Sequence, residues 1–144
     1  MYNLDTARID SVLQHMGDRM KLLEALIRLP DEQILSDQTT IAALERALHT
    51  TIEAIVDVGN ALIDGFIMRD PGSYTDIVDI LQDEQVLDAQ TAGVLTKLVA
   101  FRKQLVHHYT DVPHAEMIRL VRDSLDSLAR FAPAVRRYIQ QELF

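Results

Sequence analysis

The spacing of apolar residues constrains this chain most, because it follows the helical period along almost the whole sequence. No stretch alternates apolar and polar residues over a useful length, and the β-branched residues are scattered. In the first segment, apolar residues recur every three or four positions, at Ile9, Leu13, Met16, Met20, Leu23 and Ile27. This spacing predicts a helix from about Asp5 to Leu29. Pro30 ends it, because proline disrupts the helical hydrogen-bond pattern.

Capping residues and turn signals divide the rest of the chain. Asp37 and Asp88 are suitable N-caps, and Asp70-Pro71-Gly72-Ser73 is typical of a turn. A break is expected over residues 110–113, and Pro133 is expected to kink or divide the last helix. The further helices are therefore predicted over about residues 37–68, 74–82, 88–109 and 114–142.

These segments predict an all-α fold, an antiparallel up-down bundle of four long helices plus one short helix. A length of 144 residues suits one domain, so residues 1–144 are expected to form a single helical domain.

The absence of cysteine excludes disulfides, thiolate metal sites and a cysteine nucleophile. The first residues do not resemble a signal peptide, and no apolar run approaches the roughly 20 residues of a membrane span. We therefore expect a cytoplasmic protein with no membrane partner.

Charge is unevenly distributed along the chain. Residues 1–96 carry 6 Lys and Arg against 17 Asp and Glu, whereas residues 97–144 carry 8 against 5. The formal net charge of −8 argues against a general nucleic-acid binder, and no DNA partner is expected. The basic C-terminal part can meet phosphate, and the acidic part can face a basic partner. An uneven solvated surface is the simpler interpretation.

The helix predicted over residues 88–109 has a charged residue on its apolar side. Arg102 occupies a seam whose spacing alternates between three and four residues and whose other members are Leu95, Leu98, Leu105 and Tyr109. A guanidinium on a packing face is costly unless it is paired or lines a wet cleft. Arg102 therefore has a carboxylate partner, such as Glu53 or Asp57, or it awaits an anionic ligand. Phosphate suits the rigid donors of arginine.

His107 and Tyr109 follow Arg102 by five and seven residues. Seven residues make two turns, so Arg102 and Tyr109 are expected to share a helix face. His107 would lie about 140° around the helix and about 7.5 Å along it. One helix does not obviously bring Arg102 and His107 to the same phosphate. Converging side chains at a cleft edge, or a second copy of the helix across a two-fold axis, would do so.

These residue types suit metal-independent RNA cleavage, in which the 2′-hydroxyl attacks the neighbouring phosphorus. A histidine can act as base or acid, because its reference pKa is about 6.5, and Arg102 can supply fixed positive charge. Tyr109 can donate a hydrogen bond to phosphate or accept a modifying group. We expect no metal and no cofactor. His107, His108 and His114 lack the i, i+4 spacing of helical metal pairs, and no glycine-rich phosphate loop is present.

Residues 101–109 read Phe-Arg-Lys-Gln-Leu-Val-His-His-Tyr, which contains the pattern R-x4-H-x-Y. This string, late in the fourth helix of such a bundle, resembles the motif of the HepT-like toxins in the HEPN superfamily. The resemblance covers most of the chain and includes residues 44–48, Ile52-Glu53 with Asp57, and Ser73-Tyr74 with Asp76. One departure is Lys103, where the family usually has a small polar residue, often asparagine. Lysine there either strengthens attraction for phosphate or removes a hydrogen bond that orients the histidine.

The resemblance implies an endoribonuclease toxin that works as a homodimer with its motif helices facing each other. Arg102 and His107 would be catalytic, with Lys103, Glu53 and Asp57 as supporting residues. It also implies an RNA substrate and a neutralising partner, a MntA-like minimal nucleotidyltransferase antitoxin. In related pairs that partner transfers AMP to the motif tyrosine, here Tyr109. The attached AMP would exclude an RNA phosphate by adding negative charge and bulk beside Arg102.

Other interpretations of these residues stay open. Arg102 can be purely structural, the histidines can favour the helix end through its dipole, and Tyr109 can be a core aromatic. The stripe formed by Glu53, Asp57, Asn60 and Asp64 can be a solvated face. The alternative function is a non-catalytic helical module that binds a nucleotide or a partner and is associated with a nucleotidyltransferase. A catalytically silent dimeric scaffold is a third.

Overall fold

The computed structural model describes residues 2–144, and every regular element within that range is an α-helix. The predicted all-α class is therefore confirmed. The six helices in chain order are α1 (Thr6–Ile27), α2 (Asp31–Ser36), α3 (Gln38–Gly65), α4 (Tyr74–Asp83), α5 (Ala89–His107) and α6 (His114–Leu143).

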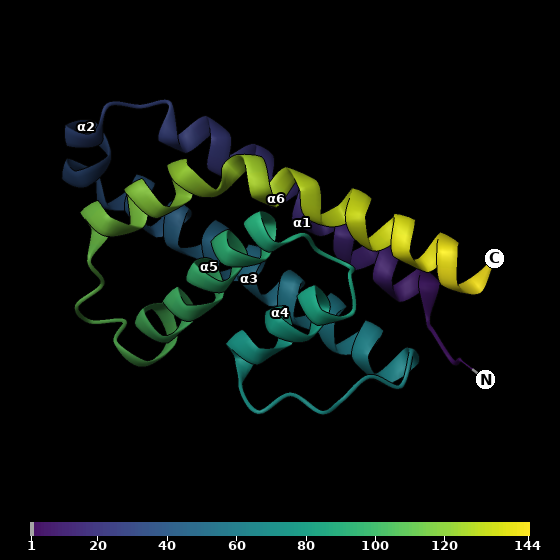
Figure 1. Cartoon of the computed structure of the whole chain (residues 1–144). Coiled ribbons are helices and arrows are strands. Elements are labelled where there is room, and N and C mark those ends of the chain that lie inside the picture. The colour runs from purple at the N-terminus through teal and green to yellow at the C-terminus, as the bar shows by residue number, and fades with distance from the viewer. Residues whose placement is uncertain (1) are drawn as a thin grey trace.

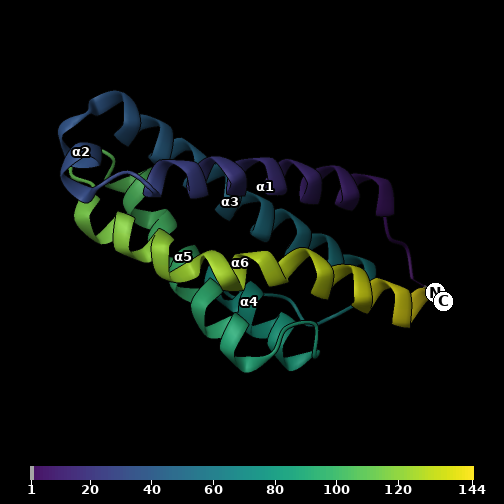
Figure 2. The ribbon, with the colours of Figure 1, turned by 90° about the horizontal axis from the view of Figure 1, so that it is seen from above.

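The long helices run alternately up and down, as predicted for an antiparallel bundle. Figures 1 and 2 show α1, α3, α5 and α6 lying along the length of the molecule, with both ends of the chain at the same end of the bundle. Helix α3 packs against α1, α4 and α5, and α6 packs against α1 and α5. The short helix α4 therefore lies on the flank formed by α3 and α5.

Side-chain caps explain where four of the helices begin. Asp5, Asp37 and Asp88 each accept a hydrogen bond from a backbone N–H in the first turn of the helix that follows. Ser73 does the same for the N–H of Asp76 at the start of α4. These bonds satisfy donors that a helix start leaves unpaired. The predicted starts at Asp37 and Asp88 are confirmed.

Helix α2 was not predicted, because six residues are too few to show a helical period. Pro30 both ends the preceding helix and stands at the N-cap position of α2. Its fixed φ suits a helix start, and Asp31 and Glu32 complement the dipole in the first turn. Ile34 is completely buried, which holds this short helix on the end of the bundle.

Other predicted boundaries also differ from the structure, and α3 ends at Gly65 rather than near Met68. Helix α5 ends at His107, so the prediction that it reaches Tyr109 is wrong by two residues. The chain turns there, and the N–H of Asp111 donates to the carbonyl of His108. Pro133 does not divide the last helix, because α6 continues through it to Leu143. The carbonyl that loses its partner belongs to Ala129, which is an exposed residue and can be hydrated.

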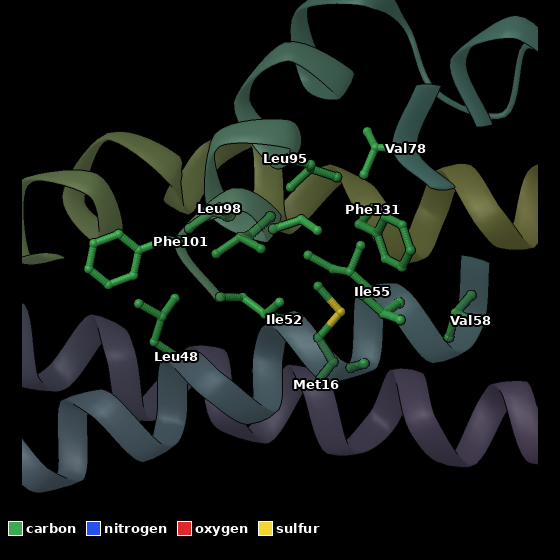
Figure 3. Close-up of a cluster of buried hydrophobic side chains, with 14 of the residues drawn as sticks. Met16, Leu48, Ile52, Ile55, Val58, Val78, Leu95, Leu98, Phe101 and Phe131 are labelled. Carbon is green, nitrogen blue, oxygen red and sulfur yellow. The ribbon is translucent and has the colours of Figure 1, made fainter. Parts of the chain in front are cut away.

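The core is a continuous set of hydrophobic side chains from α1, α3, α4, α5 and α6. Figure 3 shows Met16, Ile52, Ile55, Leu98 and Phe131 converging from four of these helices. Each of these five side chains is almost fully buried. Their burial fixes the rotation of α3 and α5, and therefore decides which polar residues of these helices meet.

Gly59 sets the distance between α3 and α4. A Cβ atom at this position would overlap Cγ2 of Ile77, which is buried on α4. The missing side chain lets α4 lie close against α3, so that its first residue, Tyr74, reaches the side of α5.

No helix within residues 2–144 has the length and apolar character needed to cross a membrane.

Candidate active site

A pocket of about 430 Å³ lies where the start of α4 meets the second half of α5. Its walls include Tyr74, Val99, Arg102, Lys103 and His107. Arg102 and His107 therefore face one pocket within a single chain. Both residues belong to α5, and His107 occupies its last turn.

Arg102 is held in place by a carboxylate from another helix. Its side chain is 17% exposed, and its Nε atom donates to Oε1 of Glu53 on α3 at 2.5 Å. This bond to Glu53 raises the pKa of the Arg102 guanidinium, so the group keeps its positive charge. The partner is Glu53 rather than Asp57, which is the choice that the sequence left open.

The ring of Tyr74 covers a second side of the same guanidinium. The Cζ atom of Arg102 lies 4.2 Å from the centroid of that ring, a distance typical of a cation–π contact. Arg102 is thus clamped between Glu53 and Tyr74. The sequence placed Tyr74 at the start of a helix but gave no sign of this contact, which depends on the packing of α4 against α5.

Arg69 holds the loop before Tyr74 in place through an ion pair with Asp76. Its Nη1 and Nη2 atoms donate to the two carboxylate oxygens of Asp76 at 2.8 and 3.0 Å. Asp76 also accepts from the backbone N–H of Gly72 at 2.8 Å. The hydrogen bond from Arg69 and that from Gly72 both lower the pKa of Asp76. These bonds fix the loop that delivers Tyr74 to the pocket.

His49 is a residue of this region that the sequence analysis missed. Its Nε2 atom lies 3.5 Å from Oε1 of Glu53, the same oxygen that binds Arg102. The i, i+4 spacing of His49 and Glu53 on α3 was the available signal. Glu53 thus stands between a histidine on its own helix and the arginine of α5.

Tyr109 faces a different groove from Arg102. It is 72% exposed and lines a groove of about 230 Å³ with Arg46, His49 and Leu105. The expectation that Arg102 and Tyr109 share a helix face is therefore wrong, because α5 ends before Tyr109. It is also not a core aromatic. Its hydroxyl group is carried on an exposed side chain just after the helix.

Lys103, Asp57 and His114 are the other candidate residues of the sequence. Lys103 is exposed and lines the pocket with Arg102. Asp57 is exposed and lines a separate groove between α1 and α3 with Arg8 and His15. His114 lies 3.2 Å from a carboxylate oxygen of Glu45. Within residues 2–144 no group of three His, Asp or Glu side chains is arranged to hold a metal ion.

Similarity to known proteins identifies the family of this chain. A sequence model described as "Ribonuclease HepT-like" matches residues 16–135, which is most of the chain. The protein belongs to the HepT-like ribonuclease family. Its sequence is 38% identical over 143 residues to "Putative RNase YutE" of Bacillus subtilis, a match that covers 99% of this chain and 95% of that protein. The resemblance based on the R-x4-H-x-Y motif is thereby confirmed at the level of the family.

Solved structures agree with this family. The structure of the cytosolic protein YutE from Bacillus subtilis superposes with a TM-score of 0.91 at 38% identity, covering 99% of this chain and 96% of that one. A tri-AMPylated HEPN toxin of Shewanella oneidensis, solved in complex with an MNT antitoxin, gives a TM-score of 0.80 at 19% identity. It covers 90% of this chain and 96% of the toxin. At that identity the similarity shows the shared HEPN fold.

Proposed function

We propose that this HepT-like protein is a metal-independent endoribonuclease toxin and that the pocket of Arg102 and His107 is its active site. The observation that carries the proposal is that a clamped arginine and a histidine line one pocket of about 430 Å³. Membership of a ribonuclease family supports it. RNA is the substrate class, because the reaction that these two side chains suit requires a 2′-hydroxyl.

In the proposed reaction, the 2′-oxygen attacks the adjacent phosphorus and the bond from phosphorus to the 5′-oxygen breaks. One product ends in a 2′,3′-cyclic phosphate and the other in a 5′-hydroxyl. His107 removes the proton from the 2′-hydroxyl or returns one to the leaving oxygen. Arg102 stabilises the charge that develops on the phosphoryl oxygens, and Lys103 attracts the RNA backbone to the mouth of the pocket.

The clamp around Arg102 supports this role. Glu53 binds Nε, and within residues 2–144 the Arg102 side chain donates no other hydrogen bond. The two terminal nitrogens are therefore free of protein partners and can form the forked contact with a phosphate. Glu53 and Tyr74 hold the guanidinium before the substrate arrives, which reduces the cost of ordering it.

A homodimer would complete the site, because one His107 cannot serve both proton transfers at once. Two copies with their α5 helices facing each other would bring two histidines and two arginines to one cleft. Light scattering at micromolar concentration tests this part of the proposal. A dimer is expected, and a stable monomer that still cleaves RNA would remove the shared site.

The proposed antitoxin is a MntA-like nucleotidyltransferase that transfers AMP from ATP to Tyr109. The Tyr109 oxygen would attack the α-phosphorus of ATP, forming a phosphodiester and releasing pyrophosphate. The exposure of Tyr109 makes its hydroxyl accessible to such an enzyme. Since Tyr109 lies two residues from His107, the attached phosphate would repel an approaching RNA strand.

Incubation of the purified protein with RNA in the presence of EDTA tests the nuclease. The wild type is expected to produce ends with a 2′,3′-cyclic phosphate, and His107→Ala should reduce the rate by about 10²–10⁴-fold, the usual contribution of a general acid or base. His108→Ala is the matched control, because this neighbouring exposed histidine does not line the pocket. Equal rates for wild type and His107→Ala, or no cleavage by the wild type and no toxicity in cells, would refute the proposal.

A further inference from the structure

The pocket beside Arg102 has an apolar end for which phosphodiester cleavage has no use. Arg102, Lys103 and His107 supply the basic side chains of the pocket, and Ser73 and Thr75 add two hydroxyl groups beside Tyr74. Val99 and Ala100 lie one turn before Arg102 and Lys103 on α5, and Tyr74 lines the same pocket from the start of α4. A phosphate alone would leave this part of the pocket empty.

The Tyr74 ring is presented to solvent in a fixed position. It is 48% exposed although it is a large aromatic residue, while one side of it is in contact with the Arg102 guanidinium. Its backbone is fixed by the N-cap of Ser73 and by the bonds from Arg69 and Gly72 to Asp76. An exposed ring held by a rigid loop can stack on a planar ligand without a large loss of side-chain entropy.

We infer that Tyr74, with Val99 and Ala100, forms a binding site for one unstacked base of the RNA strand whose phosphate meets Arg102 and His107. This inference rests on the proposed function of the pocket and makes Tyr74 a residue that determines substrate binding. The size fits, because ligand pockets typically measure about 300–1,000 Å³. The substrate class follows from this arrangement, since a base can be splayed onto an aromatic ring only from a single-stranded segment.

The hydroxyls of Ser73 and Thr75 at this end lie 3.2 Å apart and bond to each other, and Ser73 also accepts from the N–H of Asp76, so they are not free to select one base edge. Stacking on an aromatic ring tolerates any base, because every base has a π-face. The site should therefore accept all four bases and favour purines, which offer more area to the ring. Cleavage in single-stranded regions with little sequence preference is the expected pattern.

Mononucleotides test the base site without any cleavage. NMR titration should show AMP binding about tenfold more tightly than ribose 5-phosphate, with shifts at Val99 and Ala100, because stacking of one base on an aromatic side chain typically contributes roughly 5- to 150-fold. Tyr74→Leu should remove this advantage, and Tyr74→Phe should keep it to within about twofold. Inorganic phosphate should bind the wild type and Ala100→Leu equally well.

Ala100→Leu is a second variant that leaves both clamps on Arg102 intact. The added side chain fills the apolar end, so AMP should bind no better than ribose 5-phosphate. Ala42→Leu is its matched control, because Ala42 is also exposed and helical but lines the groove beside Tyr109. AMP that binds the wild type no more tightly than ribose 5-phosphate, or equally well to Ala100→Leu, would overturn the inference.

Cleavage kinetics separate this inference from the proposed function. On single-stranded RNA, Ala100→Leu, which leaves both clamps on Arg102 in place, should raise KM about tenfold and leave kcat within about threefold. An unchanged KM, in an enzyme that still depends on His107, would refute the base site and leave the nuclease standing. A wild type that binds AMP as described but never cleaves RNA would refute the nuclease and leave the base site standing.

Discussion

Glu53 on α3 and Arg102 on α5 are 49 positions apart in the sequence and share a hydrogen bond of 2.5 Å. The bond links the two helices and fixes the charge that faces the pocket. His49 contacts the same carboxylate oxygen from the groove that Tyr109 lines. Glu53 therefore connects the proposed active site with the surroundings of the proposed modification site.

Glu53→Gln should weaken both the site and the fold. The glutamine keeps the size of the side chain but loses the charge that pairs with Arg102. The pair is partly exposed, so the free energy of unfolding should fall by only about 1 kcal/mol. RNA cleavage should fall about tenfold if the arginine loses its orientation at a cost near 1.4 kcal/mol. Urea unfolding and initial cleavage rates measure the two effects.

Asp57→Asn is the matched control for that experiment. Asp57 lies one turn further along α3, is exposed, and lines the same groove between α1 and α3 as Glu53, but the ion pair with Arg102 is made by Glu53. Its substitution should leave cleavage within about twofold, since a screened surface charge contributes little. If both variants lose activity equally, Glu53 has no special role in holding Arg102.

Gly59→Ala should destabilise the protein although alanine favours helices. The added Cβ would overlap Cγ2 of Ile77, and relieving such overpacking typically costs about 1–3 kcal/mol. Gly93→Ala is the control, because a Cβ there meets no atom within 4 Å and should gain roughly 0.5–1 kcal/mol. Opposite shifts of the urea midpoints are expected. Two shifts of the same sign would contradict the close approach of α3 and α4.

The loop before Tyr74 should lose stability in acid. Because Arg69 and Gly72 lower the pKa of Asp76, the folded state favours the ionised carboxylate. The stabilisation is therefore complete above the ordinary aspartate pKa near 4, and it is lost as the pH falls through the lowered value. The melting temperature of Asp76→Asn should lie below that of the wild type at pH 7, and the gap should shrink below pH 4.

Asp79→Asn serves as the control for the acid experiment. Asp79 is exposed on the same helix and makes no hydrogen bond or ion pair among the contacts of residues 2–144. Its melting temperature should follow that of the wild type at both pH values. A gap between wild type and Asp76→Asn that stays constant from pH 7 to pH 3 would show that the carboxylate charge is not responsible.

Tyr109→Phe should separate modification from cleavage. The phenylalanine lacks the hydroxyl that would accept AMP, so the mass increase on incubation with a MntA-like enzyme and ATP should disappear. Since Tyr109 does not line the pocket of Arg102, cleavage should stay within about threefold of the wild type. Tyr2→Phe is the control, because Tyr2 is another exposed tyrosine. Unchanged AMP transfer to Tyr109→Phe would place the acceptor elsewhere.

The fold was largely predictable because helices leave local signals. The apolar period, the caps at Asp37 and Asp88 and the turn at residues 70–73 all report short-range geometry. The same limit explains the errors. Helix α2 was too short to show a period, and the end of α5 was placed at Tyr109 because tyrosine continues an apolar seam as well as leucine does. Pro133 does not interrupt α6, since the carbonyl that it deprives of a partner can be hydrated.

The sequence by itself determined the helical class, the family motif and the presence of an arginine that needs a partner. Tertiary structure decided that the partner is Glu53, that Tyr74 covers the guanidinium, and that Tyr109 faces another groove. The physical reason is that periodicity fixes which face of a helix is apolar. Which polar residues of two helices meet depends on the rotation and offset set by core packing, here by side chains such as Ile52, Leu98 and Phe131.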